Sequence, residues 1–396
     1  MFEQIEMAAP DAILGINEAF RADPNPARIN LSVGVYKDSQ GATPVLASVK
    51  TSEERLLAGE STKSYLGIDG IPEYGRLVRE MLFGTDCEII AGNRAVTIQS
   101  PGGTGALRVA GDFLHANCPS SSIWFSTPTW ANHLKVFGAA EMATHQYAYF
   151  DAAANGLDCE ALLADLRKIP SGDVVCLHAC CHNPTGVDPT AEQWSQIGET
   201  VYERGLIPLL DFAYQGFGDG LVEDTAGLRA FCRPGAEFLV ASSFSKNFSL
   251  YRERVGALTV VTADANTATT VLSQLKSTIR TNYSNPPAHG AQIVQTILEN
   301  ADLKAQWEGE LAEMRERING MRNLFAETMA AKCPDRDFSF LKRGRGMFAF
   351  SGLTPEQVDR LKEEHSVYMV RNGRINVAGM TETNMDPLCS AIAAVL

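Results

Sequence analysis

The sequence predicts an α/β protein with a mostly parallel sheet, and two observations support this fold class. Three short apolar segments, DVVCLHACC (173–181), LIPLLDFAY (206–214) and EFLVASSF (237–244), have the near-continuous hydrophobicity of strands buried on both faces. A helix pattern with a capping box, Thr190 and Gln193, lies between the first two segments. A strand, a helix and a second strand at this spacing form a parallel unit, whose ligands bind at the carboxyl ends of the strands.

A second, smaller α+β unit is predicted in the last quarter of the chain. The segments GMFAFSG and YMVRNGRINVAGM have strand character and enclose a charged helix pattern over 355–364. A long amphipathic pattern over 303–332 precedes them and predicts a helix that leaves the large unit and enters the small one. Its apolar positions follow steps of mostly three and four: Trp307, Leu311, Met314, Ile318, Met321, Leu324, Phe325 and Met329.

Composition narrows the class of protein. The chain has 396 residues, 45% of them hydrophobic and 20% charged, which is typical of a globular protein of two or three domains. A net charge of -13 excludes a nucleic-acid backbone as partner, because such binding needs a basic face. No Lys or Arg precedes Arg21, and no apolar run approaches the roughly 18 to 20 residues that span a bilayer. We therefore expect a cytoplasmic protein that does not bind membranes.

The nine cysteines include a pair in the cluster HACCHN (178–183). Their odd number and the lack of C-x-x-C spacing favour reduced thiols over a disulfide framework. Alternation along a strand would place His178, Cys180 and His182 on one face, where a soft metal could bind. The apolar run that contains them favours buried thiols and hydrogen-bonded histidines instead, so we predict no metal site.

Polar residues follow the carboxyl ends of the three predicted strands: Asn183, Asp211, Tyr214, Ser243 and Lys246. Taken alone, a carboxylate such as Asp211 at the end of an apolar strand indicates a salt bridge or a helix cap, and Tyr214 a core aromatic. A lysine beside an apolar strand has its pKa lowered by desolvation, which favours the neutral amine that forms Schiff bases.

The segment SPGGTGALRVAGDFL (100–114) runs from a glycine-rich loop into a helix. It is either a tight turn before a buried helix or an anion site built from backbone N–H groups and the helix N-terminus. An anion cradle at 102–104 with Ser243 and Arg254, a carboxylate at Asp211 and an imine-forming Lys246 together match the requirements of pyridoxal phosphate.

The chain resembles the aspartate and aromatic subgroup of the class I aminotransferases over essentially its whole length. The segments that carry the resemblance are INLSVGVYKD near the start, NPTG (183–186), DFAYQGF (211–217), SFSKNFSLYRERVG, TIRTNYSNPPAHG (278–290) and GRINVAGM (373–380). The resemblance implies fold type I of the pyridoxal-phosphate-dependent transferases, with a mostly parallel seven-stranded sheet in the large domain and a smaller α+β domain. The implied boundaries are an N-terminal arm (1–12), a small domain (13–43 and 314–396) and a large domain (44–313).

The resemblance also implies the roles of the site residues. Lys246, Asp211 and Tyr214 would be catalytic: Lys246 binds the cofactor and shuttles the proton, Asp211 keeps the ring nitrogen protonated, and Tyr214 contacts the phenolic oxygen. Asn183 would share that contact, Trp130 would stack on the ring and His133 would support Asp211. The phosphate would be held by Gly103, Thr104, Ser243 and Arg254, with Tyr65 reaching across from a second subunit.

Substrate recognition would depend on two arginines in a homodimer with shared sites. Arg374 matches the family position for the α-carboxylate and Arg280 the position for the distal carboxylate, supplied by the other subunit; Gly34, Trp130 and Asn183 complete the substrate contacts. Residues of acidic-substrate relatives lining or bordering the pocket occur at Val35, Lys37, Thr43, Thr104 and Asn285, whereas Ser64 departs from the expected asparagine.

The resemblance therefore implies an aspartate aminotransferase that uses pyridoxal phosphate, an amino acid and a 2-oxo acid in a ping-pong reaction. Three alternatives stay open at this point. They are an aromatic aminotransferase of broad specificity, another enzyme of the same fold such as a β-decarboxylase, and a binding or scaffold protein without chemistry.

Overall fold

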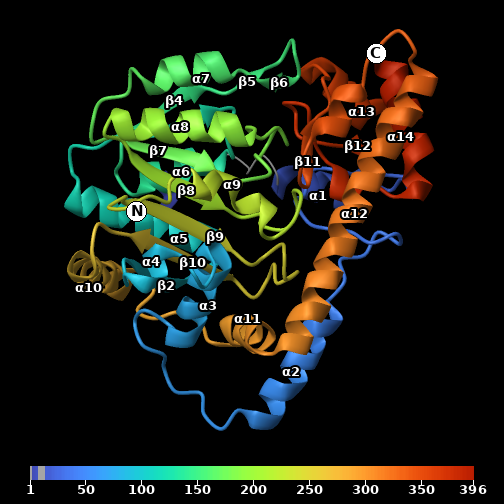
Figure 1. The fold of residues 1–396 in the computed structure, drawn as a ribbon. Helices are drawn as coiled ribbons and strands as arrows, with labels where there is room; N and C mark the ends of the chain where they lie inside the picture. Colours follow the sequence, from blue (N-terminus) through green and yellow to red (C-terminus); the bar gives the residue numbers. More distant parts are fainter. Residues whose placement is uncertain (1, 8–13) are drawn as a thin grey trace.

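The computed structural model describes residues 2–7 and 14–396, and a seven-stranded sheet lies at its centre (Figure 1). The strand order is β2-β10-β9-β8-β7-β3-β4, and β10 alone in this sheet runs antiparallel to its neighbours. The predicted mostly parallel sheet is confirmed. Its strands are β2 (Ala95–Pro101), β3 (Ile123–Thr127), β4 (Thr144–Ala148), β7 (Val174–His178), β8 (Ile207–Phe212), β9 (Phe238–Ser243) and β10 (Val255–Val261).

Helices cover both faces of this sheet, which explains the continuous hydrophobicity of its strands. Val174 and Cys176 of β7 pack in a core with α5, α6 and α10, whereas Val175 and Leu177 pack on the opposite face with α7 and α8. The large unit contains α2 (Ala47–Gly59), α3 (Pro72–Phe83), α4 (Glu88–Ala91), α5 (Gly102–Asn117), α6 (Asn132–Ala139), α7 (Cys159–Leu166), α8 (Ala191–Glu203), α9 (Ala226–Arg229), α10 (Ala265–Asn282) and α11 (His289–Glu299), with a 3-10 turn η2 (Glu223–Thr225) and a hairpin of β5 (Phe150–Asp151) and β6 (Gly156–Leu157).

The long helix predicted from the apolar periodicity is α12 (Ala301–Lys332). It runs along one side of the molecule from α11 and α2 to the C-terminal unit (Figure 1). That unit contains α1 (Leu14–Ala22), β1 (Ile29–Asn30), η3 (Ser339–Arg343), β11 (Phe348–Phe350), α13 (Pro355–His365), β12 (Val367–Tyr368), β13 (Arg374–Asn376), η4 (Val377–Gly379) and α14 (Glu382–Val395). Strand β1 pairs with β12 and β11 with β13, so the segment near the N-terminus joins the C-terminal α+β unit.

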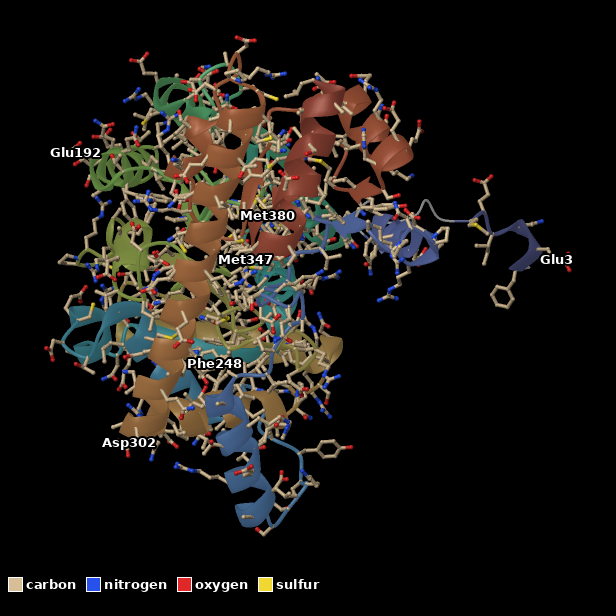
Figure 2. All side chains as sticks on the ribbon, turned by 90° about the vertical axis from the view of Figure 1, so that its right-hand side faces the viewer. Glu3, Glu192, Phe248, Asp302, Met347 and Met380 are labelled. Atoms are coloured by element: carbon tan, nitrogen blue, oxygen red, sulfur yellow. The ribbon has the colours of Figure 1, made fainter. Side chains whose placement is uncertain are left out.

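The N-terminal segment projects from the body of the molecule. Figure 2 shows Glu3 well away from the other labelled residues, and η1 (Phe2–Gln4) begins this segment. Residues 1 and 8–13 lie outside the described residues, and so does much of the predicted arm. The three domain boundaries stay predictions. Among the helices of the described ranges, none has the length and hydrophobicity needed to cross a membrane.

Two local predictions are confirmed and two need correction. The capping box at Thr190 and Gln193 starts α8, and residues 173–181 contain a buried strand. That strand ends at His178, however, and Cys181 has a φ of 52°, so Cys180 and His182 do not continue a strand face. The glycines at 102 and 103 lie in the first turn of α5 and not in a separate loop.

The histidines of the HACCHN cluster differ in their hydrogen bonding. His182 contacts the hydroxyls of Ser126 (2.9 Å) and Thr185 (2.8 Å), as a buried histidine should. His178 is buried, but neither ring nitrogen has a hydrogen-bond partner among the described residues. The prediction of satisfied histidines was therefore wrong for His178; the Oδ2 atom of Asp211 is 3.9 Å from its Nε2, which is too far for a hydrogen bond. All nine cysteines are free thiols, as predicted.

Candidate active site

A cavity of about 240 Å³ opens where β7, β8 and β9 end. It brings together most of the predicted site residues: Gly34, Gly103, Thr104, Trp130, Asn183, Asp211, Tyr214, Ser243, Lys246, Arg254 and Arg374. They come from the large unit except Gly34 and Arg374, which come from the segment around β1 and from β13. The cavity therefore lies between the two units, at the position expected for a ligand of a parallel sheet.

One wall of the cavity is built from small and hydroxylated residues. A Cβ atom at Gly103 would lie 2.9 Å from the Cβ of Ser243, so only glycine fits between helix α5 and strand β9 at this point. The Nη1 of Arg254 donates to Ser245 Oγ (3.3 Å) and to the carbonyl of Tyr251 (2.8 Å). A cation, hydroxyls and the N-terminus of a 16-residue helix line the same wall, and this donor set suits a phosphate group.

Lys246 follows β9 and is partly buried. Burial lowers its pKa to about 8, although the charge of Asp211 opposes the shift. Its Nζ lies 4.7 Å from the centre of the Tyr214 ring. Burial, followed by the charge of Asp211, raises the pKa of Tyr214, so its hydroxyl stays protonated at neutral pH. The pair offers an amine that is neutral in more molecules than an ordinary lysine would be, and a phenol that donates a hydrogen bond.

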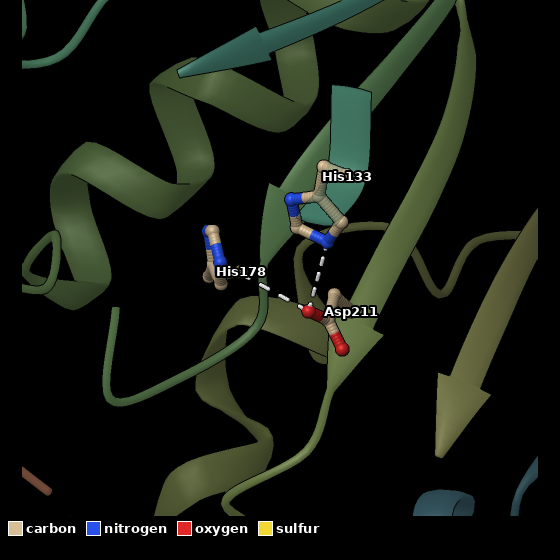
Figure 3. A group of neighbouring side chains, drawn as sticks. All are labelled: His133, His178 and Asp211. Atoms are coloured by element: carbon tan, nitrogen blue, oxygen red, sulfur yellow. Dashed lines mark hydrogen bonds and ion pairs between the residues drawn. The ribbon is translucent and has the colours of Figure 1, made fainter. Parts of the chain in front are cut away.

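Asp211 lies at the floor of the cavity, and a histidine supports it from behind (Figure 3). The Nε2 of His133 is 3.1 Å from Oδ2 of Asp211, and Nδ1 of the same ring contacts the Thr129 hydroxyl at 2.8 Å. Burial by itself raises the pKa of Asp211, but the hydrogen bond and charge of His133, followed by His178 and Lys246, hold the pKa below its usual value. The cavity thus has a carboxylate that stays ionised near neutral pH.

His178 completes this group, and His133, His178 and Asp211 could hold a metal ion by their geometry. Burial lowers the pKa of His178 to about 3, so the ring is neutral. The Trp130 ring lies edge-on to His133, with 5.3 Å between ring centres. Both histidines lie behind the cavity wall and neither lines the cavity.

Arg374 is buried and has an incomplete set of partners. Its Nη2 donates to the Ser32 carbonyl at 2.6 Å, and Nη1 contacts Asn183 Oδ1 at 3.4 Å. Its Nε is buried without a hydrogen-bond partner, and its guanidinium lies 4.4 Å from the centre of the Phe348 ring. No carboxylate of the described residues forms an ion pair with it, so a buried cation faces the cavity without a counter-ion.

Besides His133, two predicted residues do not line the cavity of a single chain. Tyr65 is 92% exposed, and Arg280, which donates to the Ser284 hydroxyl, is also exposed. Of the five positions expected to mark an acidic-substrate pocket, only Thr104 lines it. Val35, Thr43 and Asn285 lie elsewhere, and Lys37 lines a different cavity.

The sequence did not single out five other residues that line the cavity: Leu107, Ala213, Ser245, Tyr251 and Phe348. Ser245 and Tyr251 lie close to Lys246 in the segment SFSKNFSLYRERVG, so their closeness in sequence could have indicated that they line the cavity. Phe348 gave no such signal, because it reaches the cavity only through the packing of β11 against β13.

A family model described as "Aminotransferase class I and II" matches residues 26–392. The chain belongs to this family. This aminotransferase is 58% identical over 396 residues, the full length of both chains, to an aspartate aminotransferase of Salmonella typhi. It is 47% identical over 394 residues to an aromatic-amino-acid aminotransferase of Pseudomonas aeruginosa, covering 100% of this chain and 98% of the relative.

A crystal structure of an aromatic-amino-acid aminotransferase from Burkholderia pseudomallei, covalently bound to pyridoxal phosphate, superimposes on this aminotransferase with a TM-score of 0.98. The identity is 48%, and the match covers 100% of this chain and 99% of the other. The predicted fold type is thereby confirmed, because structural neighbours at this similarity share the whole topology and not only the central sheet.

The residues of this aminotransferase fit pyridoxal phosphate on the geometry of the cavity alone. The Gly103 wall has no room for a side chain, and hydroxyls and the Arg254 guanidinium gather beside it. Lys246 and the ionised Asp211 line the same space, so an aldehyde and a protonated ring nitrogen would each have a partner.

Proposed function

We propose that this aminotransferase transfers the amino group of L-aspartate to 2-oxoglutarate, giving oxaloacetate and L-glutamate, with pyridoxal phosphate as cofactor. The observation that carries the proposal is the buried Arg374, which forms no ion pair with a carboxylate of the described residues, in the cavity that also contains Lys246 and Asp211. A planar guanidinium binds a carboxylate with two parallel hydrogen bonds, and an α-carboxylate is common to both substrates. Identities of 58% and 57% over the full length to two aspartate aminotransferases support aspartate as the amino-group donor.

Each cavity residue has a role in this proposal. When bound, the cofactor supplies an electron sink that stabilises negative charge on the substrate Cα. Asp211 would hold a proton on the ring nitrogen. Lys246 would attach the cofactor through its ε-amine and would serve as the base that takes the proton from the substrate Cα. Its pKa near 8 suits this task, because an effective base titrates near the working pH.

Other residues position the two reactants. Gly103, Thr104, Ser243 and Arg254 would hold the phosphate, and Ser245 accepts a hydrogen bond from Arg254. Tyr214 and Asn183 would donate to the phenolic oxygen, and Trp130 would cover the ring. In the second half of a ping-pong cycle, the same residues would act in reverse to transfer the amino group to a 2-oxo acid.

We further propose a homodimer in which Tyr65 and Arg280 enter the site of the partner. Both are exposed in the single chain, and a tyrosine that is 92% exposed is typical of an interface residue. Arg280 would hold the distal carboxylate of aspartate. A cytoplasmic location remains a prediction.

A spectroscopic half-reaction tests the function. Adding aspartate to the enzyme loaded with pyridoxal phosphate should bleach the absorbance band of the lysine-bound cofactor, and adding 2-oxoglutarate should restore it. Lys246→Ala should abolish amino transfer. A band that aspartate leaves unchanged would sink the proposal, and release of carbon dioxide or ammonia as main product would favour a β-decarboxylase or a lyase.

Broad specificity toward aromatic amino acids is the second candidate. The 47% identity to an aromatic enzyme supports it, as does Ser64, whose hydroxyl contacts Thr62 at an exposed position beside Tyr65. Comparison of kcat/KM for aspartate, phenylalanine and tyrosine separates the two candidates.

A further inference from the structure

A second cavity lies in the C-terminal unit, and the charged residues of its described lining are cations. Its volume is about 330 Å³, and among residues 2–7 and 14–396 no Asp or Glu lines it. The lining residues are Phe20, Pro26, Ala27, Arg28, Ile29, Asn30, Lys37, Gly379, Thr383, Asn384 and Pro387. In a chain with a net charge of -13, a cavity whose described lining has two cations and no acid favours the binding of an anion.

Neither cation has its hydrogen-bonding capacity filled. Arg28 donates from Nη1 to the Asn25 carbonyl at 3.1 Å and lies 5.0 Å from the centre of the Phe20 ring, but its Nε is buried without a partner. Within residues 2–7 and 14–396, the ammonium of Lys37 forms no hydrogen bond and no ion pair with any carboxylate. Burial lowers the pKa of Lys37 from its usual value.

The N-terminus of α14 adds a third source of positive potential. Thr381 and Asn384 form a capping box, and Thr383 and Asn384 of the first turn line the cavity. The first amides of a helix lack intrahelical acceptors; the Asn384 amide donates to Thr381 Oγ1 at 3.2 Å, which leaves the amides of Glu382 and Thr383. The dipole of this 14-residue helix favours a negative charge there, and the exposed Glu382 in the same turn, which does not line the cavity, offsets part of this potential. Asp23 lowers the local charge near Arg28, but its carboxylate already accepts from the Tyr368 hydroxyl at 2.7 Å and the Asn25 amide at 2.8 Å.

We infer that this cavity binds a small oxyanion, a phosphate or a dicarboxylate, between Arg28, Lys37 and the first turn of α14. Phosphate and carboxylate groups both carry negatively charged oxygens, and these accept hydrogen bonds from guanidinium and ammonium groups. The site is separate from the active site, since none of its lining residues lines the active-site cavity.

The inferred site is connected to Arg374, the proposed substrate-binding arginine, through hydrogen bonds of the segment 28–37. Arg28 and Lys37 are the two ends of the segment 28–37, whose middle contacts β13: the Ser32 carbonyl accepts from Arg374, and the Val33 and Val35 carbonyls accept from Asn376. A bound oxyanion would restrain both ends of the segment that holds the substrate-binding arginine.

Isothermal titration of the enzyme loaded with pyridoxal phosphate tests the inference, with inorganic phosphate and succinate as separate probes. The variants are Lys37→Gln and the double variant Arg28→Gln/Lys37→Gln. The matched control is Arg167→Gln/Lys168→Gln, which removes two charges from the exposed end of α7. The single variant replaces an amine without a partner in the described structure, so it keeps the experiment valid if the double variant unfolds.

We expect wild-type enzyme to bind at least one probe, Lys37→Gln to weaken that binding roughly tenfold or more, and the control to match wild type within about twofold. Because Arg374 and Arg280 also attract oxyanions, only the binding phase that Lys37→Gln diminishes is assigned to this cavity. Loss of the phosphate phase or of the succinate phase identifies the ligand class.

Two outcomes overturn the inference. One is affinity for both probes that is the same in Lys37→Gln as in wild type. The other is the absence of any binding phase in wild type below about 50 mM of either probe. Because the titration involves no turnover, its result is independent of which amino acid the enzyme transaminates.

Discussion

Nε2 of His133 lies 3.1 Å from Oδ2 of Asp211; both residues are buried, Asp211 lines the cavity that contains Lys246, and His133 lies behind it. The contact holds the carboxylate in one orientation and favours its ionised form. A buried negative charge destabilises the folded protein unless it is compensated, so this pair indicates that the charge of Asp211 has a functional role.

Asp211→Asn should lower kcat for amino transfer by roughly two to three orders of magnitude, the usual effect of removing one preorganised electrostatic partner. The amide keeps the size of the side chain but cannot hold a proton on the ring nitrogen. Asp173→Asn is the matched control, since Asp173 is a buried carboxylate that accepts from Ser122 and Trp124 far from the cavity. Equal kcat losses in both variants would show that the loss reflects folding and not chemistry.

Lys246 should make the cofactor-free protein less stable at neutral pH than at alkaline pH. Its pKa is about 8 when folded and about 10.5 when unfolded, so between these values the unfolded chain binds the extra proton. The contribution of Lys246 to the free energy of unfolding therefore rises with pH across this window, and the burial penalty is largest below pH 8.

Urea unfolding of the cofactor-free Lys246→Met variant and of wild type, at about pH 7 and about pH 9.5, measures this contribution. We expect the variant to be the more stable protein at the lower pH and its advantage to shrink at the higher pH. Lys342→Met, at an exposed position, should show no such change. A difference independent of pH would contradict the lowered pKa.

Arg280→Ala should reduce kcat/KM for aspartate by roughly a hundredfold or more, because two charge-assisted hydrogen bonds to the distal carboxylate are lost. For phenylalanine, which has no distal carboxylate, the change should stay below about tenfold. Arg336→Ala removes an exposed arginine elsewhere and serves as the control. Parallel losses for both substrates would assign Arg280 to dimer stability instead.

Subunit exchange tests whether each site uses residues of both chains. Lys246→Ala and Arg280→Ala homodimers should each be inactive toward aspartate, whereas a mixture allowed to exchange should recover about a quarter of wild-type activity. Half of the randomly formed dimers are mixed, and each mixed dimer has one site with both wild-type residues. If the mixture stays inactive after exchange, as verified by mass spectrometry, Lys246 and Arg280 act within one chain.

The sequence was sufficient for the features that depend on local patterns. Continuous apolar runs predicted β7, β8 and β9, apolar periodicity predicted α12, and the capping box predicted the start of α8. The signature around Lys246, with Arg254 eight residues later, correctly predicted two residues that line the cavity. Residues of one short segment stay close together in any fold.

Other features were missed because they arise from packing between distant segments. His178 ended as a buried ring without hydrogen bonds, since β7 stops at this residue and the chain turns away. Phe348 reaches the cavity through the pairing of β11 with β13, and a Cβ atom at Gly34 would lie only 2.6 Å from its ring.

Lys37 shows most clearly the difference between what local sequence indicates and what packing between distant segments decides. Its place in VYKD suggested a residue bordering the substrate pocket, but the short strand β1 pairs with β12 and directs the segment toward α14. The sequence by itself determined the sheet, the long helix and the chemistry at the strand ends, because hydrophobic periodicity and side-chain type are local properties. Only the tertiary structure decided which charges share a cavity and which carboxylates compensate them, because those relations depend on contacts between residues hundreds of positions apart.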